Sequence, residues 1–194
     1  MEEFRQTIIK SLAAGFLIGL GGTAYLAIDN KIIASFMFSI GLLVICVEGY
    51  YLFTGKVSYT NNVSFLLIIL GCNLFAAFLT GEIIAFTQPK LIPHAIDVCR
   101  NKMAEGWRVI PLGILCNVLI YFAVEGYKRR CRELVIMCVM AFILCGFEHS
   151  IANTFYFSLA NVIAPWYILL NIIGNAIGGV IIFIIRGIRS NDGG

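Results

Sequence analysis

Six long apolar segments constrain this chain more than any other feature of its sequence. They lie near residues 10–28, 32–53, 63–86, 109–127, 134–160 and 165–186. A helix needs about 20 apolar residues to cross a bilayer, and each segment reaches roughly that length. The fifth is too long, and too polar at its centre, for one regular helix. The sequence therefore predicts an all-α membrane protein with six transmembrane helices.

The composition excludes other classes of protein. Of the 194 residues, 60% are hydrophobic and 13% are charged, whereas a soluble domain carries about 25% charged residues. No small-residue cleavage site follows the first apolar run, so we do not expect the opening "MEEFRQTIIK" to belong to a signal peptide. Long polar or basic tracts are absent, which excludes a disordered chain and predicts no nucleic-acid partner.

The distribution of positive charge predicts the orientation. If both termini share one side, that side holds nine of the 14 Lys and Arg residues, four of them in the short run "KRRCR" at 128–132. Cytoplasmic loops carry an excess of Lys and Arg. We therefore expect a multi-pass protein of the cytoplasmic membrane with both termini in the cytoplasm.

The cysteines offer two interpretations, packing or redox and metal chemistry. There are seven, none of them in a C-x-x-C pair, and most lie in or beside apolar segments. Zinc and thiol-exchange sites use tighter spacings than these, and buried cysteine commonly packs as a small hydrophobe. Packing is the favoured interpretation, so the sequence predicts no metal site and no cofactor.

Weak internal similarity links the two halves of the chain. "EGYYLFTG" (48–55) closes the second apolar segment, and "CGFEHSIAN" (145–153) interrupts the fifth. "GCNLFAAF" (71–78) and "GNAIGGVI" (174–181) both place Asn near Gly ahead of small residues. Matched interruptions in two halves are typical of inverted-repeat transporters. We predict a single domain over 1–194 with inverted halves at roughly 10–86 and 109–186.

Specific motifs resemble those of the formate/nitrite transporter family. They are "AAGFLIGLGG" (13–22), "LFTG" (52–55), "GILCN" (113–117), "GFEHSIAN" (146–153) and "NIIGNAIGG" (171–179), in the order of the family. The resemblance implies an aquaporin-like fold of six spans whose second and fifth are broken by irregular loops. It also implies a homopentamer with one pore through each protomer.

The same resemblance implies roles for individual residues. His149 matches the central pore histidine and Glu148 its neighbour, Asn117 the asparagine near that histidine, and Thr54 the threonine that faces the pore from the first loop. Lys102 resembles the pore-directed lysine. The apolar residues match two constrictions: Phe38 and Phe142 on the extracytoplasmic side, and Leu42, Leu52 and Phe53 on the cytoplasmic side.

Each polar residue has a chemical role to weigh against a structural one. His149, desolvated and neutral, can hydrogen-bond a small anion and exchange a proton with it, or it can be a core histidine bonded to a carbonyl. For Glu148 we favour holding its loop by accepting backbone N–H bonds over relaying protons. Lys102 supplies positive potential for an anion. The alternatives are a plain loop lysine there, or Arg100 or Arg108 in its place.

These observations predict a transport protein rather than an enzyme. We expect a passive channel or a proton-coupled transporter for small monovalent anions of weak acids, such as formate, nitrite or hydrosulfide, with the bilayer and possible protons as partners. Burial favours the neutral form of a weak acid, which crosses an apolar ring more easily than its anion. A membrane redox enzyme is the alternative from another class, although only His94 and His149 are available as histidine ligands. A non-conducting structural relative is the third possibility.

Overall fold

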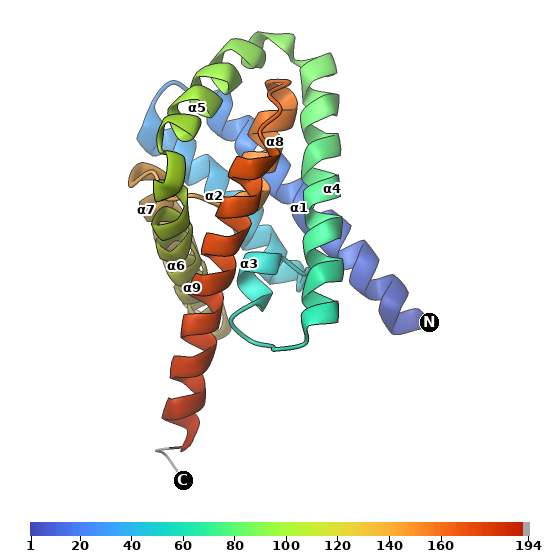
Figure 1. Cartoon of the computed structure of the whole chain (residues 1–194), viewed down its shortest axis with the longest axis vertical. Helices are drawn as coiled ribbons and strands as arrows, with labels where there is room; N and C mark the ends of the chain where they lie inside the picture. The colour runs from blue at the N-terminus through green and yellow to red at the C-terminus, as the bar shows by residue number, and fades with distance from the viewer. Residues whose placement is uncertain (192–194) are drawn as a thin grey trace.

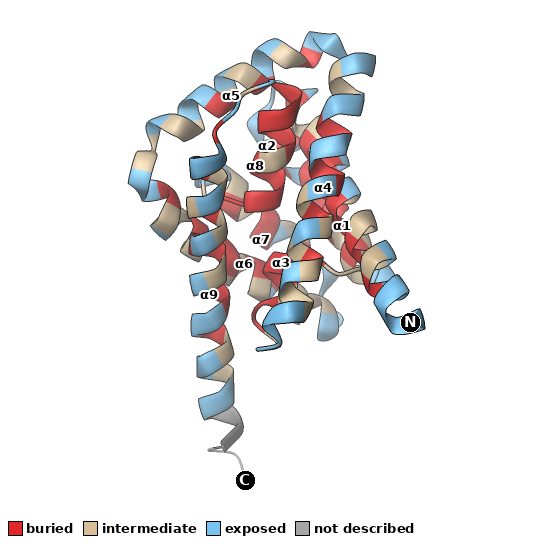
Figure 2. Ribbon diagram, turned by 45° about the vertical axis from the view of Figure 1, so that its right-hand side comes forward, coloured by how far each residue is buried: buried red, intermediate tan, exposed pale blue. Residues whose placement is uncertain are grey.

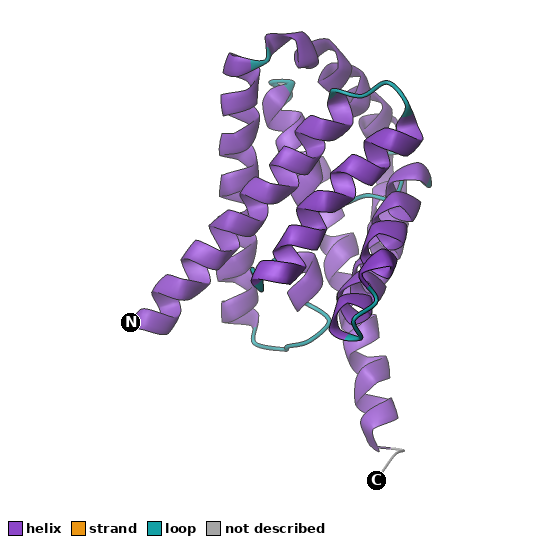
Figure 3. Ribbon diagram, turned by 180° about the vertical axis from the view of Figure 1, so that it is seen from behind, coloured by secondary structure: helices purple, strands orange, loops and turns teal. Residues whose placement is uncertain are grey.

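The computed structural model describes the backbone of residues 1–191 and the side chains of residues 1–188. Every regular element in this described part is a helix (Figure 3). The elements in chain order are α1 Glu2–Leu26, α2 Lys31–Glu48, α3 Phe53–Lys56, α4 Val63–Thr87, α5 Ile92–Ala104, α6 Val109–Lys128, α7 Arg132–Leu144, α8 Ser150–Leu159 and α9 Pro165–Asn191. Short 3-10 turns at Pro89–Leu91 and Gly106–Arg108 flank α5.

Five of the described helices are long and apolar enough to cross a membrane. They are α1, α2, α4, α9 and the α6 helix with the turn that precedes it. Figure 1 shows them running between the end where α5 lies and the opposite end, to which both chain termini project. The protein is a multi-pass membrane protein.

Two of the predicted apolar segments are interrupted. Residues 49–52 separate α2 from the four-residue α3, and residues 145–149 separate α7 from α8, which have 13 and 10 residues. The predicted segment 134–160 is therefore two shorter helices in the structure. Each of these is too short to cross a bilayer alone.

The same local geometry ends both α2 and α7. Gly49 and Gly146 have φ values of +65° and +70°, a left-handed conformation that glycine adopts without a Cβ penalty. Tyr50 N–H donates to Ile45 C=O, five residues back, at 3.0 Å. Phe147 N–H donates to Phe142 C=O in the same way at 2.8 Å. This is the Schellman arrangement, so each helix ends because its glycine turns the chain away from the helix axis.

Small residues bring the long helices into close contact. A Cβ atom on Gly15 of α1 would lie 2.4 Å from the carbonyl oxygen of Asn73 in α4. A Cβ atom on Gly174 of α9 would lie 2.5 Å from the carbonyl oxygen of Ile110 in α6. Such contacts leave no room for a side chain, and small residues of this kind drive helix association where no water is present to be expelled. The helices of the pairs α1–α4 and α6–α9 are thus packed backbone against backbone at these glycines.

Buried residues gather along the axis of the molecule, and the outer faces of the helices are exposed and apolar (Figure 2). The core contains large side chains from several helices, including Ile18, Phe38, Leu42, Ile120 and Tyr167. The exposed faces carry residues such as Phe75, Leu67 and Ile184, each more than half exposed. Apolar outer faces of this extent fit a lipid environment or a protein partner.

Candidate functional site

One buried asparagine holds the loop between α2 and α3. Asn73 of α4 accepts a hydrogen bond from Phe53 N–H at 2.8 Å, where α3 begins. Its amide nitrogen donates to Tyr51 C=O in the loop at 3.0 Å and to Ser11 C=O in α1 at 2.7 Å. Tyr51 N–H donates to Lys10 C=O at 3.3 Å. The backbone groups freed by the break are therefore satisfied inside the protein, which is the condition for irregular backbone at membrane depth.

A second buried asparagine holds the loop between α7 and α8 in the same way. Asn175 of α9 accepts from Ser150 N–H at 2.9 Å, where α8 begins. Its amide nitrogen donates to Glu148 C=O and to Gly113 C=O in α6, both at 2.9 Å. Glu148 N–H donates to Leu112 C=O at 3.3 Å. Each bond of the first loop thus has a counterpart in the second.

The correspondence extends to the residue that precedes each short helix. Leu52 and His149 both stand three positions after the left-handed glycine, and both have extended backbone, with φ of −100° and −109°. Both begin a short, buried helix. His149 therefore occupies in the second loop the position that an apolar leucine occupies in the first.

His149 is buried, and both of its ring nitrogens have partners. Nδ1 lies 3.2 Å from the backbone nitrogen of Ala152, and Nε2 lies 3.0 Å from Thr54 Oγ1. A backbone N–H can only donate, so Nδ1 accepts and caps the start of α8. In the neutral ring the proton then belongs to Nε2, which donates to the threonine hydroxyl. The histidine joins the two short helices at the centre of the protein.

The tautomer limits what His149 can do as a proton donor. Loss of the Nε2 proton from a neutral ring would leave an imidazolate anion in a buried position, which is very unfavourable. Proton transfer to a bound anion would therefore require a second proton on Nδ1, where Ala152 N–H now donates. In the observed arrangement His149 is a hydrogen-bond donor.

Glu148 is the centre of a buried polar network. Its carboxylate accepts from Lys102 Nζ at 2.9 Å and from Asn153 Nδ2 at 2.6 Å. Asn153 also donates to Asn171 Oδ1 at 2.7 Å, and Asn171 donates to Glu148 C=O at 2.8 Å. The described hydrogen bonds to the carboxylate come from side chains. The backbone N–H donors that the sequence analysis expected for Glu148 bond elsewhere, because the two loops take their acceptors from Asn73 and Asn175.

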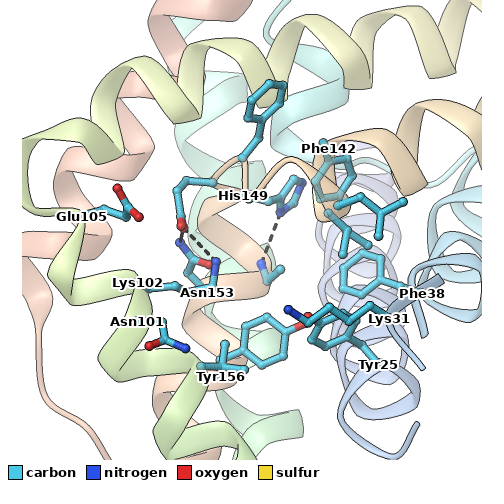
Figure 4. Close-up of a pocket in the computed structure, with 17 residues that line it drawn as sticks. Tyr25, Lys31, Phe38, Asn101, Lys102, Glu105, Phe142, His149, Asn153 and Tyr156 are labelled. Carbon is cyan, nitrogen blue, oxygen red and sulfur yellow. Dashed lines mark hydrogen bonds and ion pairs between the residues drawn. The ribbon is translucent and has the colours of Figure 1, made fainter. Parts of the chain in front are cut away.

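A cavity of about 280 Å³ opens toward α5 and reaches His149 (Figure 4). Phe38 and Phe142 lie at its inner end with ring centroids 6.1 Å apart, and the Phe142 ring stacks on the His149 imidazole at 6.0 Å. Its charged lining residues are Lys31, Lys102, Glu105 and Glu148. The positive charge of Lys102 is therefore offset by its ion pair with Glu148.

A second cavity, of about 310 Å³, lies between the C-terminal part of α2, α3 and the C-terminal part of α6. Leu42, Leu52 and Gly55 are among its lining residues, together with Lys56 and Lys128. Gly55 directly follows Thr54, whose hydroxyl contacts His149. The two cavities thus approach the His149–Thr54 pair from opposite ends of the protein, with buried apolar side chains between them.

Three of the residues assigned by resemblance line neither cavity: Thr54, which contacts His149, and Phe53 and Asn117. Phe53 packs with Val57 and Ile69 in a separate apolar cluster and lines neither cavity. Asn117 is fully buried in α6. In the amide orientation that satisfies both of its ends, Asn117 donates to Thr54 C=O and Asn175 C=O and accepts from Gly179 N–H. It supports the α3 and α9 backbones, and His149 is not among these partners.

The basic residues near Lys102 face other surroundings. Arg100 pairs with Asp97 and Arg108 with Glu105, and both arginine side chains are more than 70% exposed. Of the three, Lys102 is the one that lines the cavity and contacts Glu148. Among the described residues no three His, Cys, Asp or Glu side chains form a group that could hold a metal ion.

The sequence analysis did not assign roles to the buried asparagines 73, 153, 171 and 175, nor to Tyr25 and Tyr156, which line the α5-side cavity. A usable signal was present for the asparagines, because an amide inside an apolar span is costly unless its hydrogen bonds are met. Three of the four, Asn73, Asn153 and Asn175, lie in the segments of internal similarity themselves.

Comparison with known proteins now identifies the family. The model of the Formate/nitrite transporter family matches residues 1–186. The chain belongs to this family. It is 23% identical over 149 residues to the formate channel FocA of Haemophilus influenzae, a match that covers 65% of this chain and 52% of FocA. It is 27% identical over 188 residues to the uncharacterized transporter YwcJ of Bacillus subtilis, covering 79% of this chain and 72% of YwcJ.

The fold of this family member is also that of solved channels. A pentameric formate channel with formate bound superposes with a TM-score of 0.80 at 20% identity, covering 97% of this chain and 96% of that one. An ion channel of the same family gives a TM-score of 0.79, also at 20% identity, covering 96% of this chain and 89% of that one. The chain spans about half the length of FocA (52%). The family resemblance stated from the motifs is confirmed.

Proposed function

We propose that this protein is a channel or transporter, not an enzyme, that carries small monovalent anions of weak acids across the cytoplasmic membrane. Membership of the formate/nitrite transporter family supports the transport function. Similarity to formate channels supports formate or an anion of comparable size as the substrate class. A single six-span domain carries this activity in the proposal.

The paired loops support six crossings. In the proposal α2 with α3 forms a broken second span, and α7 with α8 forms a broken fifth span. The equivalent bonds made by Asn73 and Asn175 support two inverted halves, near 10–86 and 109–186, that meet at the His149–Thr54 contact. Broken helices that meet near the midplane are the usual place for a substrate site in such transporters.

The observation that carries the proposal is the line of contacts between the two cavities. Phe38 and Phe142 line the cavity on the α5 side together with His149, and Leu42 and Leu52 line the other cavity. In the proposal, His149 and Thr54, which are 3.0 Å apart, lie between these two apolar pairs. An apolar constriction opposes the passage of a bare charge, whereas donors between two constrictions can replace part of the hydration shell.

His149 and Thr54 are the proposed substrate contacts. An anion that displaces Thr54 Oγ1 from His149 Nε2–H would gain that hydrogen bond, and the threonine hydroxyl could turn to donate a second. If a proton accompanies the anion, a proton from water in one of the cavities must first bind to Nδ1 of His149. The hydrogen bond from Ala152 N–H to Nδ1 is then lost. The proton on Nε2 could then pass to the anion and leave a neutral ring with its proton on Nδ1. Passive and proton-coupled transport differ in this step.

The cationic side chains support attraction of anions at both ends. Lys102 with Lys31 lies at the α5-side cavity, and Lys56 with Lys128 lies at the other. The excess of positive residues at the terminal end supports cytoplasmic termini.

Homopentameric assembly is proposed from the fold shared with a pentameric channel. The exposed apolar faces supply surface for such contacts.

The test is anion flux into liposomes, measured for wild type, His149→Phe and the matched control His94→Phe across about pH 5 to 8. His94 bonds Leu26 C=O on the flank of α5 and is not a proposed substrate contact. We expect His149→Phe to lower formate flux about 10- to 100-fold, since a hydrogen bond to a charged group is lost, and, if transport is proton-coupled, to abolish its pH dependence as well.

The control should retain wild-type flux and pH dependence, and both variants should keep the wild-type oligomeric state. Undiminished flux with the same pH response in His149→Phe would contradict a substrate contact at His149. Absence of flux for formate, nitrite and hydrosulfide in the wild-type protein would contradict the function itself.

A further inference from the structure

A third cavity, of about 510 Å³, lies between the C-terminal ends of α6 and α9 and shares Tyr59 with the second cavity. It is lined by the basic side chains Arg129 and Arg186, the phenols of Tyr59 and Tyr121, the ring of Phe183, and Glu125. We propose that this cavity binds the phosphate-bearing headgroup of an anionic phospholipid.

Helix length places the cavity at the edge of the bilayer. α9 has 27 residues and is therefore about 40 Å long, which exceeds the hydrocarbon thickness of about 30 Å. Arg186 follows Pro165 by about 32 Å along the helix axis. Arg129 directly follows the last residue of α6. Figure 1 shows the end of α9 continuing beyond its neighbours at the terminal end of the molecule. Both arginines are thus at headgroup depth.

The charge of the cavity favours an anion. Its one acidic lining residue, Glu125, is already engaged by Tyr59 Oη, by Lys128 Nζ at 3.4 Å and by Arg129 Nη2 at 3.8 Å. Two cations therefore pair with this carboxylate, and Arg186 adds a further positive charge to the cavity lining. Arg186 uses Nη1 to donate to Ser58 C=O at 2.9 Å. A guanidinium has five N–H donors, so this bond leaves most of its capacity for a phosphate oxygen.

The loop that carries Tyr59 gives the cavity a fixed wall. The Tyr59 ring contacts two cations, with Lys128 Nζ 3.3 Å and the Arg186 guanidinium carbon 4.2 Å from its centroid. Burial and the hydrogen bond to Glu125 raise the pKa of Tyr59, so the phenol stays protonated and keeps donating. The basic groups are therefore held in place before any ligand arrives.

The apolar surroundings favour a lipid over a soluble phosphate. Phe183 lies one helical turn before Arg186, toward the membrane interior, where acyl chains begin. Phe122 and Ile184 on the same two helices are about half exposed, at 47% and 56%. A phospholipid can place its phosphate against the arginines and its chains along these residues. A free phosphate could contact the arginines but would make no use of the apolar residues.

Native mass spectrometry of the purified full-length protein tests the proposal, with phosphatidylglycerol, phosphatidylcholine and inorganic phosphate as probes. The variants are Arg129→Gln, Arg186→Gln and the double variant, with Arg132→Gln as the control of equal charge change. Arg132 begins α7 at the same end but does not line the cavity. Arg129→Gln leaves the bond from Arg186 to Ser58 intact, so it stays informative if the other variants fold poorly.

We expect retention of phosphatidylglycerol over phosphatidylcholine, with a loss of about fivefold for each arginine removed and no loss in Arg132→Gln. Equal retention of the two lipids, or wild-type retention in the double variant, would overturn the proposal. Displacement of phosphatidylglycerol by millimolar phosphate would assign the cavity to a soluble anion instead. Loss of the oligomer in Arg129→Gln with unchanged lipid retention would assign it to a subunit contact.

Discussion

The buried ion pair between Lys102 and Glu148 gives the sharpest test of how the central loop is held. The two groups are 2.9 Å apart, and their side chains are 17% and 3% exposed. Removing one partner from a buried pair costs about 3–5 kcal/mol, because the other charge is left uncompensated. Without its partner, the Lys102 ammonium can be hydrated in the cavity, whereas the Glu148 carboxylate stays buried. The two single variants should therefore lose different amounts of stability.

Lys102→Met should be the more damaging change. The remaining Glu148 carboxylate would be almost wholly buried without a cationic partner, although Asn153 still donates to it, so we expect a loss of about 3–5 kcal/mol in the free energy of unfolding. Glu148→Gln should cost about 1.5–3 kcal/mol. Its amide oxygen can still accept from Asn153, and the freed ammonium lines a cavity where it can be hydrated.

The double variant distinguishes an ion pair from two independent contributions. Lys102→Met with Glu148→Gln leaves no buried charge, so its loss of stability should be no larger than that of Lys102→Met alone. The measurement is equilibrium unfolding in mixed micelles, with oligomeric state followed in parallel. Losses that simply add in the double variant, or a smaller loss for Lys102→Met than for Glu148→Gln, would refute this account.

Two further predictions use the same unfolding assay. Asn175→Leu should lower the free energy of unfolding by about 1–3 kcal/mol, because Ser150 N–H loses its acceptor. Glu148 C=O keeps its hydrogen bond from Asn171 in this variant. A neutral result would show that the loop is held by other contacts. Gly146→Ala, at φ of +70°, should cost about 1–2 kcal/mol, whereas Gly71→Ala, inside α4 with nothing within 4 Å, should be neutral or stabilising. Equal effects of the two alanines would contradict the role of the left-handed conformation.

Local sequence patterns determined the class of fold and the positions of its interruptions. Apolar runs of membrane-spanning length predicted a helical membrane protein, since a span needs no information from its neighbours to be recognised. The glycines in "EGYYLFTG" and "CGFEHSIAN" lie where α2 and α7 end. A glycine that permits positive φ acts on its own backbone, so such breaks are visible in the sequence.

Tertiary contacts decided which polar side chain serves which loop. Asn73 and Asn175 accept hydrogen bonds from backbone N–H groups that lie 20 and 25 residues earlier in the chain. Each also donates to a helix carbonyl group more than 60 residues earlier. Nothing local separates them from Asn117, which lies in an equally apolar helix and supports α3 and α9 instead. Their roles depend on which helices cross, and at what depth.

The same distinction applies to Leu52 and Phe53. Both are apolar and adjacent, and the motif assigned both to one constriction, yet Leu52 lines a cavity while Phe53 packs against α4 and α9. The sequence by itself determined where the long apolar helices lie and where two of the apolar segments are interrupted, because those properties follow from backbone conformation and hydrophobicity. The direction in which each residue of α3 and α8 faces was decided only by the packing of these short helices against α1, α4, α6 and α9, since that direction depends on neighbours distant in the chain.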